Sequence, residues 1–208
     1  MRADWYQGIF WERYGVMSQF DQVLRFWFDR QPNEPGSGNA RKVWFTKDPE
    51  FDQEIQSRFL GLYEQAAAGK LDDWQETPSG CLALVIVLDQ FPRNLFRGDP
   101  RSFATDAQAL SITEMAIARG FDQALPPVQR WFLYLPFMHS EELAHQQRSV
   151  ELFATLRDDP DVATAYPFAL RHQEVVERFG RFPHRNAILD RPSTPEELEF
   201  LKQPGSGF

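Results

Sequence analysis

The sequence lacks several features that would indicate a particular class of protein. It contains one cysteine, Cys81, which excludes an intramolecular disulfide and a zinc site built from cysteine pairs. The longest apolar run, from Cys81 to Leu88, stops at Asp89 and is far shorter than the ~18–20 residues of a membrane span. No continuous apolar segment of the secretory type occurs at the N-terminus. We therefore expect a cytoplasmic protein with a buried Cys81 and no membrane contact.

Positive charge is scarce, and the common cofactor motifs are missing. The chain carries 22 Lys and Arg against 30 Asp and Glu, a formal net charge of −8, which argues against broad binding to nucleic acid. Neither a Gly-x-Gly-x-x-Gly nor a Gly-x-x-x-x-Gly-Lys-Ser/Thr loop is present, and His-Glu-x-x-His is absent. The sequence therefore predicts no cofactor, no metal and no nucleic-acid partner.

What the chain does contain is enough apolar surface for one core. Its 208 residues are 42% hydrophobic and include 6 Trp, 5 Tyr and 19 Phe. Residues 1–16 are aromatic but show no helical pattern, so we expect an N-terminal extension there. Residues 17–208 are expected to form a single all-α domain.

Apolar residues recur at spacings of three and four, as in Phe51, Ile55 and Phe59, and strand-like alternation is nowhere sustained. Short connections favour antiparallel hairpins stacked as a bundle or a short superhelix. The eight expected helices are Gln19–Phe28, Pro49–Ala68, Pro78–Phe91, Thr105–Ala118, Pro127–Tyr134, Glu141–Arg157, Asp161–Arg178 and Pro195–Leu201.

Local chemistry predicts where these helices begin and end. An Asp or Thr before Pro is typical of a capped helix start, as at Asp48, Thr77, Asp159 and Thr194. Capping boxes are expected for Thr105 with Gln108 and for Thr194 with Glu197. Glycines at 69, 120 and 180 are expected to end helices, Pro136 is expected to break one, and Gln31–Ala40 is the expected mobile loop.

Two short segments are basic within this acidic chain. Phe91–Arg101 carries three arginines and one aspartate, and Arg178–Arg191 carries four arginines and one aspartate. Both contain Phe-Pro followed by Arg-Asn, with a histidine inserted in the second. The proline restricts the turn, which then presents a guanidinium and a carboxamide. This arrangement suits bidentate binding of a carboxylate or phosphate. The alternative is that these arginines form surface ion pairs and the asparagines bond the backbone.

A third segment joins a histidine to a helix start. His139 is expected just outside a helix, with Ser140 at its N-cap and Glu141 four residues before His145. Neutral imidazole beside a helix N-terminus can act as a base. The alternative is that Ser140 and Glu141 stabilise the helix start and His139 fills a polar site.

Five ordered motifs resemble the DUF924 family of mostly bacterial proteins over about residues 20–201. They are Phe26-Trp27-Phe28, Trp44-Phe45 with Phe51-Asp52, Leu88 to Asn94, Tyr134 to Glu141, and Arg178 to Asn186. The resemblance implies a fold like that of tetratricopeptide-repeat proteins, a superhelix of α-hairpins, but it does not supply a reaction. Its motifs fall on Asp89, Gln90, Arg93, Asn94, His139, Ser140, Glu141, His184, Arg185 and Asn186.

These observations lead to a first hypothesis, the binding of a small phosphorylated or carboxylated metabolite. Arg93 and Arg185 would bind the anionic group, and Asn94 and Asn186 would orient the ligand. Arg97 and Arg181 are further expected ligand contacts, together with Asp89, Gln90 and Ser140. His184 or His139 would act as acid or base in a hydrolysis or isomerisation, with Glu141 orienting an imidazole.

Two other readings remain open. A helical groove of the tetratricopeptide type could bind a peptide or its C-terminal carboxylate, and a second copy of the chain is a further possible partner. Alternatively, the motifs lock helix ends together. The first hypothesis requires the two Phe-Pro segments to meet in space.

Overall fold

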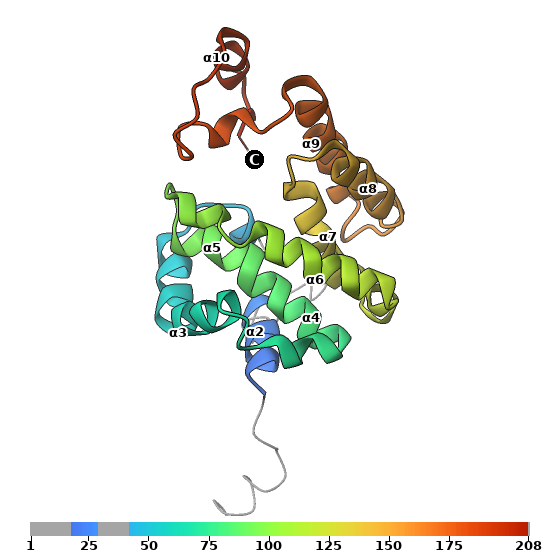
Figure 1. The fold of residues 1–208 in the computed structure, drawn as a ribbon. Coiled ribbons are helices and arrows are strands. Elements are labelled where there is room, and N and C mark those ends of the chain that lie inside the picture. Colours follow the sequence, from blue (N-terminus) through green and yellow to red (C-terminus); the bar gives the residue numbers. More distant parts are fainter. Residues whose placement is uncertain (1–17, 29–41, 208) are drawn as a thin grey trace, which may run out of the picture.

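The computed structural model describes residues 18–28 and 42–207, and these are helical with no strand. The aromatic extension expected for residues 1–16 and the loop expected for Gln31–Ala40 lie outside the described residues. The α-helices are α2 (Gln19–Phe28), α3 (Pro49–Ala67), α4 (Pro78–Val85), α5 (Phe91–Leu95), α6 (Asp106–Ala118), α7 (Pro127–His139), α8 (Leu143–Ala154), α9 (Ala165–Phe179) and α10 (Pro195–Leu201). The all-α prediction is therefore confirmed, and the arrangement is compatible with stacked α-hairpins (Figure 1).

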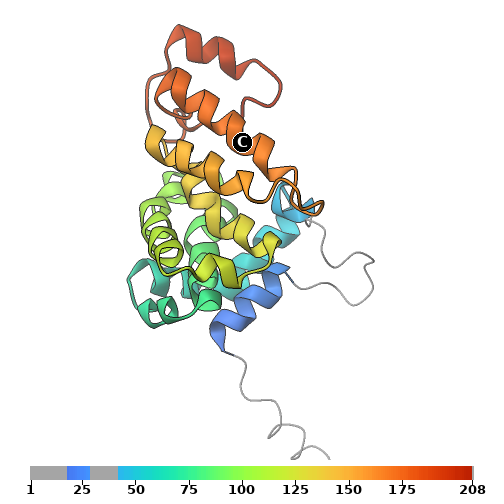
Figure 2. The same cartoon turned by 90° about the vertical axis from the view of Figure 1, so that its right-hand side faces the viewer.

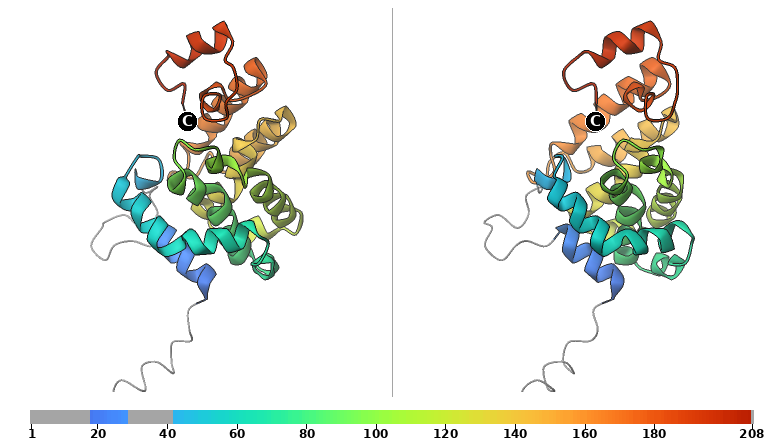
Figure 3. Two further views of the ribbon diagram at one scale, coloured as in Figure 1. Left: turned by 60° about the vertical axis from the view of Figure 1, so that its left-hand side comes forward. Right: turned by 90° about the vertical axis from the view of Figure 1, so that its left-hand side faces the viewer.

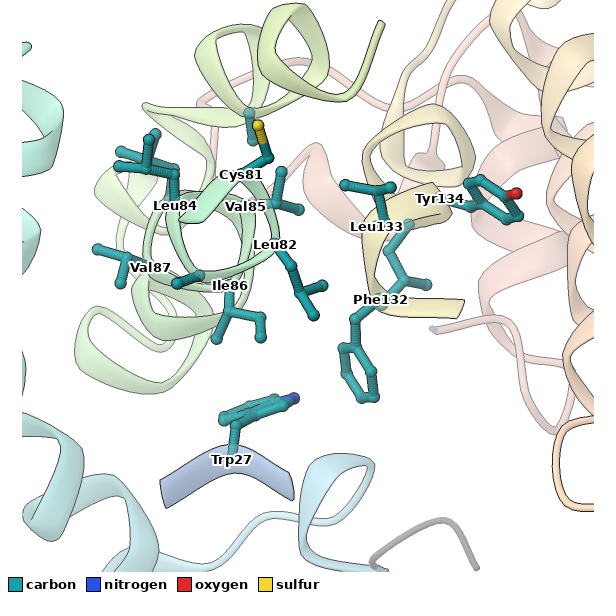
Figure 4. Packing of buried hydrophobic residues seen from close by; sticks show 14 of the residues in the cluster. Trp27, Cys81, Leu82, Leu84, Val85, Ile86, Val87, Phe132, Leu133 and Tyr134 are labelled. Atoms are coloured by element: carbon teal, nitrogen blue, oxygen red, sulfur yellow. The ribbon is translucent and has the colours of Figure 1, made fainter. Parts of the chain in front are cut away.

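The centre of the fold is one apolar rod. Helix α4 continues through a π-helical segment, η3 (Ile86–Gln90), directly into α5. Side chains point outward from this rod in every direction, with Ile86 toward Trp27 and Leu82 toward Phe132 (Figure 4). A helix that is apolar on all sides has to be enclosed, and the residues from Cys81 to Leu88 are 0–2% exposed. Burial also raises the pKa of Cys81 to about 11, so this thiol remains protonated and structural.

Helices α2, α3, α6 and α7 surround this rod, and α2, α3 and α7 contribute aromatic rings to the core. Trp27 of α2 lies at the middle, with ring centroids 5.7 Å from Phe91 and 5.5 Å from Phe132. The edge-to-face contact with Phe132 has an interplanar angle of 89°, which aromatic quadrupoles favour. The aromatic residues of the first half of the chain thus pack against α5 and against the N-terminal half of α7.

The C-terminal helices extend away from this core. Helices α8 and α9 pack against each other and against α7, and α10 lies at the end of the molecule opposite the start of α2 (Figures 1 and 2). The same separation is visible from two other sides (Figure 3). Val175, Val176, Phe182 and Phe200 form a small apolar cluster apart from the main core. The segment from Gly180 to Leu201 is therefore joined to α9 through this small apolar cluster, and to the rest of the molecule through the polar contacts described below.

Helix boundaries follow the capping chemistry in several places. The Asp48 carboxylate accepts the Glu50 and Phe51 amides, and the Thr77 hydroxyl accepts the Gly80 amide. Thr194 and Glu197 form the expected capping box. Gly180 ends α9 at φ 66°, in the left-handed region that favours glycine.

Other expected boundaries were wrong. Helix α7 continues through Pro136 to His139 because Phe137 and Met138 fill buried positions one turn further on. Likewise, the rod that was expected to stop at Phe91 continues through Pro92 to Leu95. Burial of apolar side chains outweighs the cost of proline in α7, whereas Pro92 falls in the first turn of α5, where proline is tolerated.

Three expected caps were also wrong. The Thr105 hydroxyl donates to the buried Leu88 carbonyl, at 2.5 Å, instead of capping α6. The chain is extended at Ser140, so α8 begins at Leu143 with Glu142 as its N-cap. Asp159 accepts the Asp161 amide in a turn, and α9 begins only at Ala165.

No helix within the described ranges is long and apolar enough to cross a membrane.

Glycine 80 is expected to be sensitive to substitution because α4 lies against the backbone of η2 (Asp72–Glu76). A Cβ at this position would stand 2.0 Å from the Trp74 carbonyl oxygen. We expect Gly80→Ala to lower the free energy of unfolding by about 1–3 kcal/mol. The matched control is Gly61→Ala in α3, where nothing lies within 4 Å of the added carbon. It should stabilise by about 0.5–1 kcal/mol, and urea unfolding of both variants checks the difference in sign.

Candidate functional site

The π-helical segment η3 places the first polar group of the site. Asp89 and Gln90 end the apolar rod and are buried, with the Asp89 carboxylate fully enclosed. The Gln90 amide donates to Asp89 Oδ2 at 2.5 Å. One turn on, the Arg93 guanidinium donates to the Asp89 carbonyl oxygen and lies 3.4 Å from Asp89 Oδ1. A π-turn inside a helix is frequent at functional sites, and here it aims a carboxylate at the end of α7.

Asp89 and His139 form a hydrogen-bonded pair. His139 Nδ1 lies 2.7 Å from Asp89 Oδ1 across a separation of 50 residues. The carboxylate fixes the proton on Nδ1, so the Nε2 lone pair faces away from Asp89. His139 is 15% exposed at its side chain, and its Nε2 has no hydrogen-bond partner among the described residues. This geometry leaves one nitrogen able to accept a proton from a bound molecule.

Burial and neighbouring charges keep Asp89 ionised and His139 neutral. Burial alone would raise the pKa of Asp89, but Arg93 and then His139 outweigh it and hold this pKa well below its usual range. Burial, and then the charge of Arg93, lower the pKa of His139 against the attraction of Asp89. Asp89 is therefore a carboxylate and His139 a neutral imidazole at neutral pH.

The two basic segments meet at Asp106, the first residue of α6. Arg93 donates two hydrogen bonds to the Asp106 carboxylate, at 2.9 and 3.0 Å. Arg185 of η6 (Pro183–Arg185) has its Nη1 3.6 Å from the same carboxylate and donates from Nη2 to the His139 carbonyl oxygen at 2.9 Å. The structure thus brings together the two arginines whose convergence the first hypothesis required.

Arg185 is held between aromatic rings in a positively charged environment. Its guanidinium carbon lies 4.6 Å from the Phe103 ring centroid and 4.7 Å from that of Phe182. Burial, and then repulsion from Arg93, lower the pKa of Arg185 to about 10. Its Nε is buried and has no hydrogen-bond partner among the described residues. The Arg185 guanidinium therefore keeps one unsatisfied donor.

Two further histidines border Arg185. Burial, followed by the charge of Arg185, lowers the pKa of His184 to about 4. Burial also lowers the pKa of His172 in α9, to about 3, and its ring packs edge-on against Phe182, at 5.5 Å between centroids. Both imidazoles are neutral at neutral pH, and the positive field of the arginines is one reason.

Glu141 has a different partner from the one expected. It receives two hydrogen bonds from Arg191, at 2.7 and 2.9 Å, and one from the Phe182 amide at 2.7 Å. No histidine of the described residues bonds to it; Asp89 is the carboxylate that orients an imidazole. Glu141 instead fastens the segment carrying Arg185 to the start of α8.

The remaining expected ligand contacts lie in separate networks. Asn94 of α5 and Arg97, in the turn after α5, both donate to Asp52 of α3. Arg181 and Asn186 both donate to Glu197 of α10. Because these groups bind one another, Asn94 and Asn186 are not oriented toward the Arg93–Arg185 pair as the hypothesis required.

Ser140 lies next to His139 but in a third network. Its hydroxyl is 2.8 Å from His145 Nδ1 and accepts the Glu142 amide at 3.2 Å. The buried Gln146 amide bonds the Ser140 carbonyl oxygen at 2.6 Å and so fixes the link between α7 and α8. Ser140 therefore positions the end of α7 rather than facing the arginines.

Sequence reasoning missed Asp106 and Phe103, and it did not place His172 at this site. Asp106 follows a predicted helix start, a position where acidic residues commonly interact with the helix dipole. Its contact with Arg185 spans 79 residues, and no local spacing encodes that distance. Across the described part of the chain, no group of three or more His, Cys, Asp or Glu side chains is arranged to hold a metal ion.

Comparisons with known proteins identify the family of this chain. The model of a family described as a bacterial protein of unknown function, DUF924, matches residues 23–205. A solved structure of a protein of unknown function from Agrobacterium tumefaciens is 42% identical, with a TM-score of 0.78. The match covers 88% of this chain and 96% of that chain. A search of curated proteins found no match. With its family model spanning the core and every residue of the Asp89–Asp106–His139–Arg185 cluster, the chain belongs to the DUF924 family.

Proposed function

We propose that this protein binds a small molecule carrying a carboxylate or phosphate at the Arg93–Arg185 pair, and that His139 acts on it as acid or base. The observation that carries the proposal is the meeting of two arginines at one carboxylate, directly beside a histidine oriented by a buried aspartate. Paired guanidinium groups of this kind are well suited to carboxylate and phosphate.

The electrostatics of the cluster support an anionic ligand. Repulsion between Arg93 and Arg185 contributes to the lowered pKa of Arg185, and an added negative charge would relieve that repulsion. The unsatisfied Nε donor of Arg185 offers a hydrogen bond to such a group. A ligand anion placed here would lie close to His139, whose backbone carbonyl oxygen Arg185 already contacts.

His139 is a better acid or base than His184. Asp89 holds the Nδ1 proton of His139, so its Nε2 can take a proton from water or from the substrate and later return it. The lowered pKa of His139 keeps it neutral and ready to act as a base at neutral pH. Negative charge that develops during a hydrolysis or isomerisation would be stabilised by the arginines.

A thermal-shift screen tests this proposal. Phosphorylated metabolites, dicarboxylates and peptides with a free C-terminus are added to the wild type and to Arg185→Lys, which keeps the charge but loses the planar fork. A ligand present at a hundred times its Kd stabilises the folded state by about 2.7 kcal/mol, which a shift in Tm detects. We expect a small anion to stabilise the wild type and to lose most of this effect in Arg185→Lys.

The matched control is Arg97→Lys, the same change in the separate pair with Asp52. It should keep the ligand-induced shift. His139→Gln should also keep binding while any turnover of the bound molecule is lost. Stabilisation by peptides alone would favour the alternative hypothesis, a groove that binds a peptide. If no compound stabilises the protein, a structural role for the arginines is favoured.

A further inference from the structure

The arginine pair already holds a carboxylate of the protein itself. Asp106 accepts two hydrogen bonds from Arg93 and lies 3.6 Å from Nη1 of Arg185. This is the position that the anionic group of a ligand would need in order to contact both guanidinium groups. Any anion that binds there has to share the arginines with Asp106 or take its place.

Sharing of the two arginines between Asp106 and a ligand anion is electrostatically unfavourable. The two arginines at the centre are balanced by two carboxylates, Asp89 and Asp106. A third carboxylate added to this balanced group would face Asp106 at short range, where like charges in a partly buried site repel strongly. Removal of Asp106 from between the arginines restores two positive charges against Asp89 alone.

Of the two carboxylates, only Asp106 can leave at low cost. Asp89 is 0% exposed and is held by Gln90, His139 and Arg93. Asp106 is 20% exposed and lies in the first turn of α6. A carboxylate turned toward solvent at that position still interacts favourably with the N-terminal end of the helix.

We infer that Asp106 is an internal competitor: it occupies the anion position between Arg93 and Arg185 until a ligand's anionic group displaces it. This inference rests on the proposed function, because it concerns the same arginines. The inference sets a requirement on the ligand. Its anionic group has to present two oxygens side by side, because the Asp106 carboxylate that it replaces forms a bidentate ion pair with Arg93. Carboxylates and phosphates meet this requirement.

Calorimetric titration of the full chain with succinate and with inorganic phosphate, at low ionic strength, tests the inference. The variant is Asp106→Asn, which keeps the shape of the side chain but removes its charge. We expect its Kd for at least one probe to be about tenfold lower than that of the wild type, because the ligand no longer has to break an ion pair. Asp106→Ser introduces a residue type common at helix starts; it should show the same gain and serves if Asp106→Asn perturbs folding. Far-UV circular dichroism establishes which variants are folded.

The matched control is Asp52→Asn. Asp52 is 19% exposed and accepts two hydrogen bonds from Arg97, so it resembles Asp106 in exposure and pairing. Its loss should leave the Kd unchanged. If the wild type binds a probe and both Asp106→Asn and Asp106→Ser bind it equally well or more weakly, the inference is overturned. The proposed function would still stand. Absence of binding in all folded variants would overturn both, whereas binding that appears only when Asp106 is neutralised would support both.

Discussion

Replacing Asp89 by alanine is expected to lower the free energy of unfolding by about 3–5 kcal/mol, the usual cost of breaking a buried ion pair. Asp89 is fully enclosed and interacts with Arg93, His139 and Gln90 together. Its removal leaves the His139 Nδ1 proton and the Gln90 amide without their acceptor, and it leaves Arg93 with Asp106 as its remaining carboxylate. Urea unfolding at neutral pH measures the loss.

The control for this prediction removes a carboxylate from an exposed pair. Glu151 lies 2.6 Å from Arg148 on the surface of α8, and both side chains are about half exposed or more. Glu151→Ala should cost less than about 1 kcal/mol, as exposed pairs do. Asp89→Asn, which keeps the shape but not the charge, should fall between the two. A cost for Asp89→Ala as small as that for Glu151→Ala would show that the buried cluster does not stabilise the fold.

Acid is expected to destabilise the protein between about pH 6.5 and pH 4, because His172 and His184 are neutral in the folded state. Their folded pKa values are about 3 and about 4, below the 6.5 of an unperturbed histidine. As the pH falls through 6.5, the unfolded chain takes up protons that the folded chain does not, so the free energy of unfolding falls. For two independent groups the loss reaches roughly 5 kcal/mol at about pH 4.5.

Urea unfolding of the wild type and of His172→Gln, His184→Gln and the double variant over this pH range checks the prediction. Each single variant should reduce the pH dependence by about half, and the double variant should remove most of it. An identical pH dependence in the wild type and the double variant would show that other groups are responsible. Glu197 adds to acid sensitivity only at lower pH, because its hydrogen bonds from Arg181 lower its pKa to about 2.

Together these expectations describe a cluster of paired charges and neutral histidines that contributes to stability and to its dependence on pH. A chain that needed only to lock helix ends could do so with apolar contacts, as Trp27 and Phe132 do in the core. The segment carrying Arg185 has such contacts through Phe182, and it has ion pairs with Glu141 and Asp106 as well. Buried charges are costly unless they are paired, and Asp89, Arg93, Asp106 and Arg185 are paired with one another in this cluster.

Local sequence determined much of the secondary structure. Apolar spacing identified the helices, and Asp48, Thr77, Thr194 and Gly180 marked their ends because a cap uses only neighbouring groups. The same local rules placed helix boundaries wrongly at Pro136. There, burial of Phe137 and Met138, a property of the whole fold, outweighed a local preference.

The candidate site divides in the same way. Residue type and local charge singled out Arg93, His139 and Arg185, since guanidinium and imidazole groups at helix ends are recognisable in any sequence. Only the tertiary structure decided their partners: Asp89 rather than Glu141 orients the imidazole, and Asp106 joins the two arginines. These contacts span between 13 and 79 residues, and their energies depend on burial and on the sum of nearby charges. Both quantities arise from how the helices pack, so no stretch of sequence read by itself contains them.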